Sequence, residues 1–406
     1  MERDHQAAAS ARRQDIALAP RRFASISPLD IIAVAESADA LGAQVLRMEN
    51  LDTDLAPPAA ALTATGDALT ELGWSSSYLP FTGKRGLRAA VSDQIHARTG
   101  HRYDPGTEVV ISSGGLAALF AALLALTDPG DHVVLTDPCY EGFIARVRLA
   151  GAQPVHVPLR PAGGRWRLDV AALDRISRAS VIVTMSPSMP TGHMLDDSEW
   201  DAMARLAERT GAWVLHDTAM ERITFDGRPL SSPLTRPELA GRTVLAGSVS
   251  KEYRMIGWRI GWAAGPAGVM RNLGSAVVYS TVVPSGFGQA GAEAALRSSD
   301  DGIGRATEQW QARRDLILGE LAGLPAVSPD GGWSLLLDAA ALGTSPRALS
   351  RHLLEHGEVA ATPMTAWGPQ VAPAYVRLVY SREPVARLAG LRDRVQRAVA
   401  ASAEAR

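Results

Sequence analysis

The stretch SVSKEYRMIGWRIGW, residues 248–262, follows the apolar run TVLAG and carries Lys251, one of only two lysines in the chain. The other lysine is Lys84, and every other positively charged side chain is an arginine or a histidine. An arginine stays protonated and forms no imine, whereas a lysine amine can lose its proton and condense with an aldehyde. Lys251 is therefore a candidate for Schiff-base chemistry at the end of a buried strand.

Short apolar segments on both sides of this stretch predict buried strands separated by helices. The expected strands are residues 131–138, 152–159, 179–187, 212–218 and 243–250. Residues 114–126 and 196–211 are expected to be helices, the second because it begins at an Asp cap and ends at a glycine. Uniformly apolar strands alternating with helices indicate an α/β fold with a mainly parallel sheet covered on both faces. Ligands of such sheets bind beyond the carboxyl ends of the strands.

The C-terminal part of the chain has a different pattern. Strands are expected at 331–339 and 375–381, and helices at 345–356 and 384–403. We therefore predict a large domain over residues 60–300 and a smaller α/β domain made of residues 25–59 and 301–406. Residues 1–24 are predicted to be a disordered tail, because they are polar and terminal.

The composition is that of an ordinary soluble globular protein and excludes several kinds of partner. A formal net charge of -2 gives no bias toward nucleic acid or anionic membranes. Cys139 is the only cysteine, which excludes an internal disulfide and a cysteine-based zinc site, and no metal site is predicted. The longest apolar run, residues 116–126, is too short to span a bilayer, and no secretory signal is readable. We expect a cytoplasmic protein with no nucleic-acid or membrane partner.

Polar residues stand where several apolar segments end. In ISSGG (111–115) the glycines open a helix, so the backbone N–H groups of Gly115 and Leu116 would face an anion; an ordinary tight turn gives the same pattern. Asp217 directly follows a buried strand, where a carboxylate is either a helix cap or a solvated strand end, or pairs with a protonated ring nitrogen. His216 is expected either to orient Asp217 through a hydrogen bond or to be a structural residue.

Together these segments resemble the aminotransferase class I/II family of fold type I enzymes, which use pyridoxal 5'-phosphate (PLP). The resemblance covers roughly residues 25–400, and its most specific motif is S-x-S-K-x(7)-R, here Ser248, Ser250, Lys251 and Arg259. It implies that Lys251 forms the internal aldimine with PLP and later carries the proton at the substrate α-carbon. The two serines and the arginine are implied to lie at the cofactor, with Ser248 and Arg259 holding its phosphate.

The resemblance implies roles for residues in other segments as well. Asp217 is implied to pair with the pyridine nitrogen, and Tyr140 in DPCYEGF to stack on the cofactor ring. Tyr78 in YLPFTGKRGLR matches a tyrosine that reaches the phosphate of the neighbouring subunit, which implies a homodimer with composite active sites. Arg377 in YVRLVYS matches the arginine that binds the substrate α-carboxylate, so the expected substrate is an α-amino acid.

Two positions depart from the family pattern. The motif N-P-T-G reads MPTG at 189–192, and the motif D-x-x-Y reads DTAM at 217–220. In the family the asparagine and the tyrosine both donate hydrogen bonds to the phenolic oxygen of the cofactor, whereas a thioether offers no donor. Met189 and Met220 are therefore expected beside the cofactor ring, where the missing donors would change the pKa of the cofactor's aldimine.

The retained motifs imply a PLP-dependent enzyme that forms an external aldimine and a quinonoid carbanion of an α-amino acid. The two methionines favour a non-standard continuation in specialised-metabolite biosynthesis, with or without a second small-molecule substrate: elimination or replacement, cyclisation, oxidation, or carbon–carbon bond formation. The alternative is an ordinary aminotransferase, converting an amino acid to a 2-oxo acid, with an unusual substrate. A transcription regulator with this fold would need a DNA-binding domain ahead of it, and only about 25 polar residues precede it.

Overall fold

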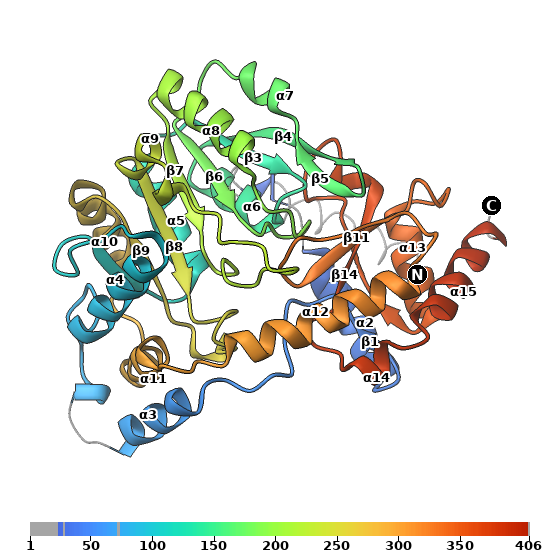
Figure 1. The fold of residues 1–406 in the computed structure, drawn as a ribbon, viewed down its shortest axis with the longest axis horizontal. Coiled ribbons are helices and arrows are strands. Elements are labelled where there is room, and N and C mark those ends of the chain that lie inside the picture. The colour runs from blue at the N-terminus through green and yellow to red at the C-terminus, as the bar shows by residue number, and fades with distance from the viewer. Residues whose placement is uncertain (1–22, 27–28, 71–73, 405–406) are drawn as a thin grey trace, which may run out of the picture.

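The computed structural model describes residues 23–26, 29–70 and 74–404, which form two lobes of different size (Figure 1). The helices are α2 (Asp30–Leu41), α3 (Ala59–Thr70), α4 (Arg85–Thr99), α5 (Gly115–Leu126), α6 (Glu141–Leu149), α7 (Val170–Asp174), α8 (Asp197–Thr210), α9 (Pro237–Ala240), α10 (Ala267–Thr281), α11 (Gly286–Arg297), α12 (Ile303–Glu320), α13 (Pro346–Gly357), α14 (Val385–Leu388) and α15 (Leu391–Glu404). The strands are β1 (Leu46–Arg47), β2 (Val109–Ser112), β3 (His132–Asp137), β4 (Gln153–Ala162), β5 (Arg165–Leu168), β6 (Val181–Met185), β7 (Trp213–Asp217), β8 (Thr243–Ser248), β9 (Gly261–Ala264), β10 (Ala326–Val327), β11 (Ser334–Asp338), β12 (Val359–Ala360), β13 (Thr362–Pro363) and β14 (Tyr375–Val379). Residues 1–22 of the predicted tail lie outside the described residues.

The large lobe is built on an eight-stranded sheet with the order β2-β9-β8-β7-β6-β3-β4-β5. Strands β8, β7, β6, β3 and β4 are parallel, whereas β9 is antiparallel to both its neighbours and β5 is antiparallel to β4. The predicted α/β fold with a mainly parallel sheet is confirmed. The five strands expected from their apolar runs are β3, β4, β6, β7 and β8. Strand β9 was not predicted, because its sequence GWAA has no β-branched residue.

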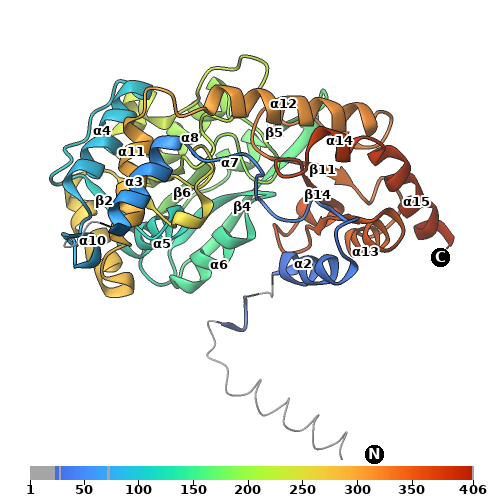
Figure 2. The same cartoon turned by 90° about the horizontal axis from the view of Figure 1, so that it is seen from below.

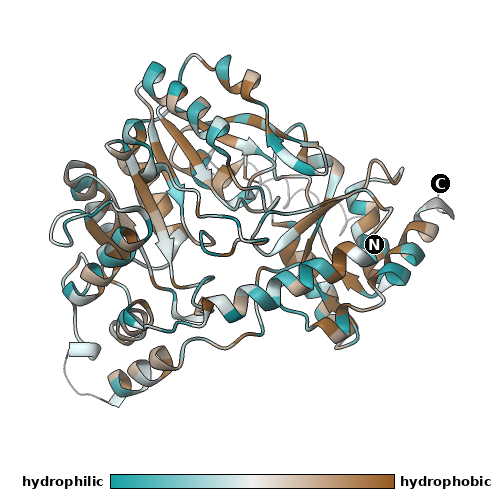
Figure 3. Ribbon diagram, in the orientation of Figure 1, coloured by the Kyte–Doolittle hydropathy of each residue, from teal (hydrophilic) through white to brown (hydrophobic). Residues whose placement is uncertain are grey.

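Helices cover both faces of this sheet. Figures 1 and 2 show α5 and α6 on one face and α8 on the other. Helix α8 begins at the predicted cap, where Asp196 accepts a hydrogen bond of 3.0 Å from the backbone N–H of Glu199, and it ends at Gly211 in the left-handed conformation. The strands between the helices are strongly hydrophobic (Figure 3), so polar side chains gather beyond the strand ends. No helix in the described ranges has the length and the apolar surface needed to cross a bilayer.

The small lobe contains the four-stranded antiparallel sheet β10-β11-β14-β13, packed with α13 and α15. Strand β1, from the N-terminal part of the chain, pairs with β12 through Leu46 and Val359. Helix α12 runs from the large lobe to the small one (Figure 1). The exact domain boundaries stay a prediction. The single helix expected at 384–403 is wrong, because Gly390, with a φ of 82°, separates α14 from α15.

Asp137, at the carboxyl end of β3, ties the two lobes together. Its carboxylate accepts hydrogen bonds from three consecutive backbone N–H groups, those of Gln370 (2.7 Å), Val371 (3.0 Å) and Ala372 (3.0 Å). Gly368 has a φ of 152° and a Cβ there would collide with this carboxylate, so a larger residue could not occupy the position. The loop at residues 367–372 is thereby held against the end of the large sheet.

Candidate active site

A cavity of about 270 Å³ lies between the lobes, beyond the carboxyl ends of β6, β7 and β8. We call it the interlobe cavity. Its lining includes every predicted site residue except Tyr78, namely Gly115, Leu116, Tyr140, Met189, Asp217, Met220, Ser248, Ser250, Lys251, Arg259 and Arg377. Tyr78 lies elsewhere on the same chain, and its residue is 80% exposed. Residues from segments far apart in the sequence therefore meet in one place, as the strand-end rule predicts.

Lys251 follows the end of β8 and is held by a segment of the N-terminal part of the chain. Its Nζ donates a hydrogen bond of 2.6 Å to the carbonyl oxygen of Leu51 and lies 5.0 Å from the ring centroid of Trp333. Burial lowers the pKa of this amine to about 8, against the opposing effect of the nearby Asp52 carboxylate. About a tenth of the amine is thus neutral at pH 7, far more than for an ordinary lysine, and the neutral form is the one that attacks an aldehyde.

Asp217 is the last residue of β7 and is only 6% exposed. Its Oδ1 accepts a hydrogen bond of 2.8 Å from the backbone N–H of Ala219. Burial raises the pKa of the carboxyl to about 6, while the hydrogen bond from Ala219 and the positive charge of Lys251 oppose the rise. A buried carboxylate of this kind is well suited to hold a protonated ring nitrogen, since the pair removes the cost of the buried charge.

His216 does not orient Asp217. Its Nδ1 shares a hydrogen bond of 2.8 Å with Thr184 Oγ1, and its ring packs edge-on against Trp200 of α8. The two side chains diverge because successive residues of a strand point to opposite faces of the sheet. Burial lowers the pKa of His216 to about 3, so the ring is neutral and has a structural role.

An anion cradle lies where β2 meets α5, opposite the end of β8. Gly114, with a φ of 89°, precedes Gly115, and the first N–H groups of α5 are exposed at this helix end. A Cβ on Gly114 would collide with the guanidinium of Arg259, so only glycine lets that group approach. Arg259 Nη1 donates to Ser250 Oγ (3.4 Å) and to the Ile256 carbonyl oxygen (2.9 Å). Hydroxyls, a guanidinium and a helix N-terminus together suit a phosphate.

Arg377, on β14, brings a fully buried guanidinium to the opposite end of the cavity. Its Nη2 donates to the carbonyl oxygen of Glu49 and to Thr362 Oγ1 (3.3 Å), and the guanidinium carbon lies 4.6 Å from the ring centroid of Trp367. Burial lowers the pKa of Arg377 to about 10, and the group remains a cation at neutral pH. Its Nε has no partner among the described residues, its Nη1 faces only a weak acceptor, and guanidinium groups bind carboxylates.

Aromatic and thioether side chains complete the cavity wall. Tyr140 packs edge-on against Trp367, with ring centroids 5.6 Å apart. Met189 and Met220 both line the cavity and are both buried. A buried lysine, a buried carboxylate, an anion cradle and an aromatic wall are the features that PLP requires, so the residues present fit this cofactor.

Several lining residues were not found from the sequence. Glu141, Met185, Phe143, Leu29 and Ile31 also line the interlobe cavity. Glu141 is the first residue of α6, where an acidic side chain usually stabilises a helix N-terminus, so its position alone gives no sign of a binding role. The apolar residues follow the ordinary pattern of core positions.

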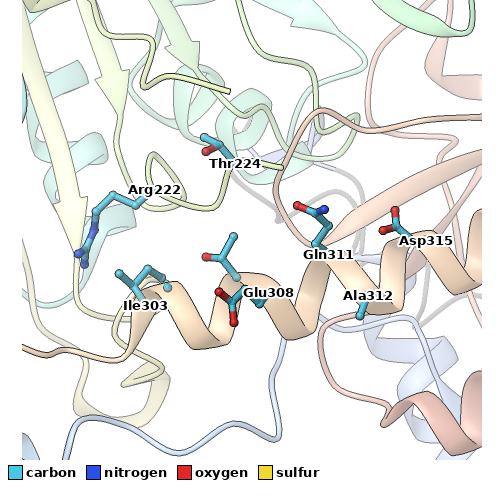
Figure 4. Close-up of a pocket in the computed structure, with 9 residues that line it drawn as sticks. Arg222, Thr224, Ile303, Glu308, Gln311, Ala312 and Asp315 are labelled. Atoms are coloured by element: carbon cyan, nitrogen blue, oxygen red, sulfur yellow. The ribbon is translucent and has the colours of Figure 1, made fainter. Parts of the chain in front are cut away.

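Two features outside the interlobe cavity were considered as alternatives. A hollow lies between α12 and the segment of Arg222 and Thr224 (Figure 4), but none of the predicted site residues lines it. The Arg222 guanidinium beside it is already paired with Glu252 and Asp301, at 2.7 and 2.6 Å. A set of potential metal ligands also comes together on α13, namely His352, Glu355 and His356, and the expectation of no metal site stays a prediction.

Comparisons with known proteins agree with the geometry. The family model described as "Aminotransferase class I and II" matches residues 46–391. The arginine–pyruvate transaminase AruH of Pseudomonas aeruginosa is 31% identical over 350 residues, covering 85% of this chain and 88% of the relative. A probable N-succinyldiaminopimelate aminotransferase, DapC of Mycobacterium tuberculosis, is 34% identical over 317 residues, covering 76% and 79%.

Solved structures give the same result. The N-succinyldiaminopimelate aminotransferase of Mycobacterium tuberculosis superposes with a TM-score of 0.86 at 29% identity, covering 94% of this chain and 99% of that one. The aspartate aminotransferase of Thermus thermophilus, solved with maleate, has a TM-score of 0.85 at 28% identity, with the same coverage. The fold and the site thus define a fold type I PLP-dependent enzyme. The chain belongs to the class I and II aminotransferase family.

Proposed function

We propose that the protein is an amino-acid aminotransferase, which removes the α-amino group of one amino acid and passes it to a 2-oxo acid. The observation that carries this proposal is the convergence of Lys251, Asp217 and Arg377 on one cavity beside the anion cradle. The named relatives are all aminotransferases. They support this reading better than elimination, replacement, cyclisation, oxidation or carbon–carbon bond formation, for which no comparison gives support.

Each residue has a separate task in this proposal. When bound, PLP supplies an aldehyde carbon that takes up the amino group and a ring that withdraws electrons from the substrate. Arg377 binds the α-carboxylate and thereby orients the α-carbon toward the amine of Lys251. Lys251, with its pKa near 8, accepts and returns the proton at that carbon, as a general base should near neutral pH. Asp217 holds the proton of the ring nitrogen.

The cofactor's remaining contacts follow from the same geometry. Gly115, Leu116, Ser248, Ser250 and Arg259 would hold the phosphate end, and Tyr140 would pack against the ring. Met189 and Met220 would lie beside the phenolic oxygen and shape the substrate side of the cavity. In this reading the two methionines alter the pKa of the bound cofactor without changing the type of reaction.

The deciding experiment incubates the purified holoenzyme with a panel of amino acids in the absence of any 2-oxo acid, followed by mass spectrometry. Transamination predicts one equivalent of pyridoxamine phosphate and one of the matching 2-oxo acid per active site. A product formed while the cofactor stays PLP would instead support the non-standard reactions. Lys251→Ala serves as the matched inactive control.

We also propose that the protein works as a homodimer in which Tyr78 completes the partner's site. Tyr78 is remote from the interlobe cavity of its own chain and strongly exposed. Phe81, Tyr279 and Phe287 are also exposed aromatic residues, and Phe287 lies in α11, which packs at its start against the turn at Trp74–Ser76. Exposed aromatic residues gathered near one surface are typical of protein interfaces.

The amino donor and acceptor are not identified by the relatives. Their names refer to arginine, aspartate and N-succinyldiaminopimelate, whose side chains differ in charge. We therefore propose only that an α-amino acid and a 2-oxo acid are the two small-molecule substrates. The choice among amino acids must come from the cavity itself.

A further inference from the structure

Glu141 lines the interlobe cavity, and its carboxylate forms no hydrogen bond or ion pair with the residues that the structure describes. The residue is 5% exposed, and its buried Oε1 has no hydrogen-bond partner among the described residues. No ion pair joins it to a described arginine, lysine or histidine within 4 Å. Because a buried, unpaired carboxylate is costly, such a group in a binding cavity calls for a ligand that supplies the missing partner.

The charges around Glu141 do not satisfy it. Arg377 directs its guanidinium at the carbonyl oxygen of Glu49, the hydroxyl of Thr362 and the sulfur of Met189 instead. Asp30 and Arg347 also act on Glu141 electrostatically, but they pair with each other at 2.9 Å. Burial raises the pKa of Glu141 to about 7, with Arg377 and Arg347 opposing the rise. About half of the carboxyl is then ionised at pH 7, and a cation that enters the cavity would favour the ionised form.

Many of the other residues that line the interlobe cavity are apolar, including Leu29, Ile31, Met185, Phe143 and Trp367, whereas Asn50 is polar. Long unbranched chains pack well against such walls, and thioethers adapt to their shape. The rings of Tyr140 and Trp367 also suit a positive charge, through cation–π contact.

Resting on the proposed aminotransferase function, we propose that Glu141 binds the cationic end of the substrate side chain. The substrate class is then an α-amino acid with an aliphatic stem and a terminal amine or guanidinium, such as lysine, ornithine or arginine. Arg377 binds the α-carboxylate and Glu141 the distal cation, so each end of the substrate meets a buried group of opposite charge. Glu141 is a specificity-determining residue with no part in the proton transfers.

The test compares cationic amino acids with neutral analogues of nearly equal shape: lysine with norleucine, ornithine with norvaline, and arginine with citrulline. The wild-type holoenzyme should prefer the cationic member of at least one pair by about 100-fold in kcat/KM. Glu141→Gln, which keeps the shape and removes the charge, should lower kcat/KM for the cationic substrate by about 30-fold or more and leave the neutral analogue nearly unchanged. Asp93→Asn removes an exposed carboxylate that does not line the cavity and should change the preference by less than about threefold.

Two results would overturn the inference. One is a wild-type enzyme with a higher kcat/KM for the neutral analogues, and the other is a Glu141→Gln variant whose kcat/KM falls equally for the cationic and the neutral substrate. A calorimetric titration of the holoenzyme with lysine and norleucine, without a 2-oxo acid, separates this question from the proposed reaction. If no amino acid yields pyridoxamine phosphate, the aminotransferase proposal fails. Tighter binding of lysine that disappears in Glu141→Gln would still support the role of Glu141, and equal binding of both ligands would refute it.

Discussion

Arg377 directs one guanidinium nitrogen at a thioether, with Nη1 3.6 Å from Sδ of Met189. A thioether sulfur is a weak acceptor, so the firmer contacts of this arginine are with the Glu49 carbonyl and the Thr362 hydroxyl. Met189 therefore neither fixes Arg377 strongly nor donates to a ligand in the cavity. An amide at this position could both hold Arg377 and donate a hydrogen bond to a ligand. Substitution of the two methionines therefore tests how they affect the site.

Replacing the methionines should change the titration of the bound cofactor. Met189→Asn combined with Met220→Tyr adds two donors at the phenolic oxygen, which stabilise its negative charge. The absorbance transition of bound PLP should then move to lower pH by about one unit. Met185→Leu alters another lining methionine without adding a donor and should leave the transition in place. An unchanged titration in the double variant would show that positions 189 and 220 do not face that oxygen.

Reduction with borohydride should fix PLP to Lys251 alone. The chain has only one other lysine, Lys84, whose Nζ lies 3.2 Å from Glu293 and over the ring of Trp74. Peptide mass spectrometry after reduction should find the adduct on Lys251 in the wild type and in Lys84→Ala. Lys251→Ala should carry no adduct and should lose turnover by about 1,000-fold or more. An adduct on Lys84 in the wild type would contradict the assignment.

The rate of PLP attachment should report the lowered pKa of Lys251. Burial lowers this pKa from its ordinary value of 10.5 to about 8, so the neutral, reactive fraction of the amine increases as the pH rises and is nearly complete above about pH 9. In stopped-flow mixing of apoprotein with PLP, the rate constant should grow several-fold between about pH 6.5 and 7.5 and level off by about pH 9. A rate that continues to climb about tenfold per unit to pH 10 would indicate an ordinary lysine.

Subunit mixing tests the composite site. If Tyr78 serves the partner, a heterodimer of Lys251→Ala and Tyr78→Ala subunits contains one doubly altered site and one intact site. Random exchange of the two weakly active variants should restore about a quarter of the wild-type activity. Sedimentation of the wild type should give the mass of a dimer. Activity that stays at the level of the separate variants, despite exchange, would place Tyr78 outside the partner's site.

The strands were predictable where local signals agreed with the tertiary structure. Apolar runs marked β3, β4, β6, β7 and β8, and caps marked α8, because these features follow from burial and backbone hydrogen bonding alone. Strand β9 was not predicted, because it is stabilised by pairing with β2 and β8 and its own sequence has little intrinsic preference for a strand. The expected link between His216 and Asp217 failed for a geometric reason, the alternation of side chains along a strand.

The candidate site was predictable to the extent that its residues belong to short motifs or end a strand. Lys251, Asp217 and Arg259 could be found in this way. Glu141 could not, because it enters the cavity through the packing of α6, and no local pattern marks that arrangement. Arg377, which would bind the substrate α-carboxylate, was predicted together with the residues that would hold the cofactor, whereas Glu141, which would select the side chain, was missed.

The three hydrogen bonds from the 370–372 backbone to Asp137 have a mechanical consequence. If the small lobe rotates relative to the large lobe and these hydrogen bonds are kept, the axis of rotation must pass near the end of β3. Tyr140 and Trp367, beside that pivot, would then be displaced least. The aromatic wall would stay nearly fixed while the more distant parts of the small lobe moved.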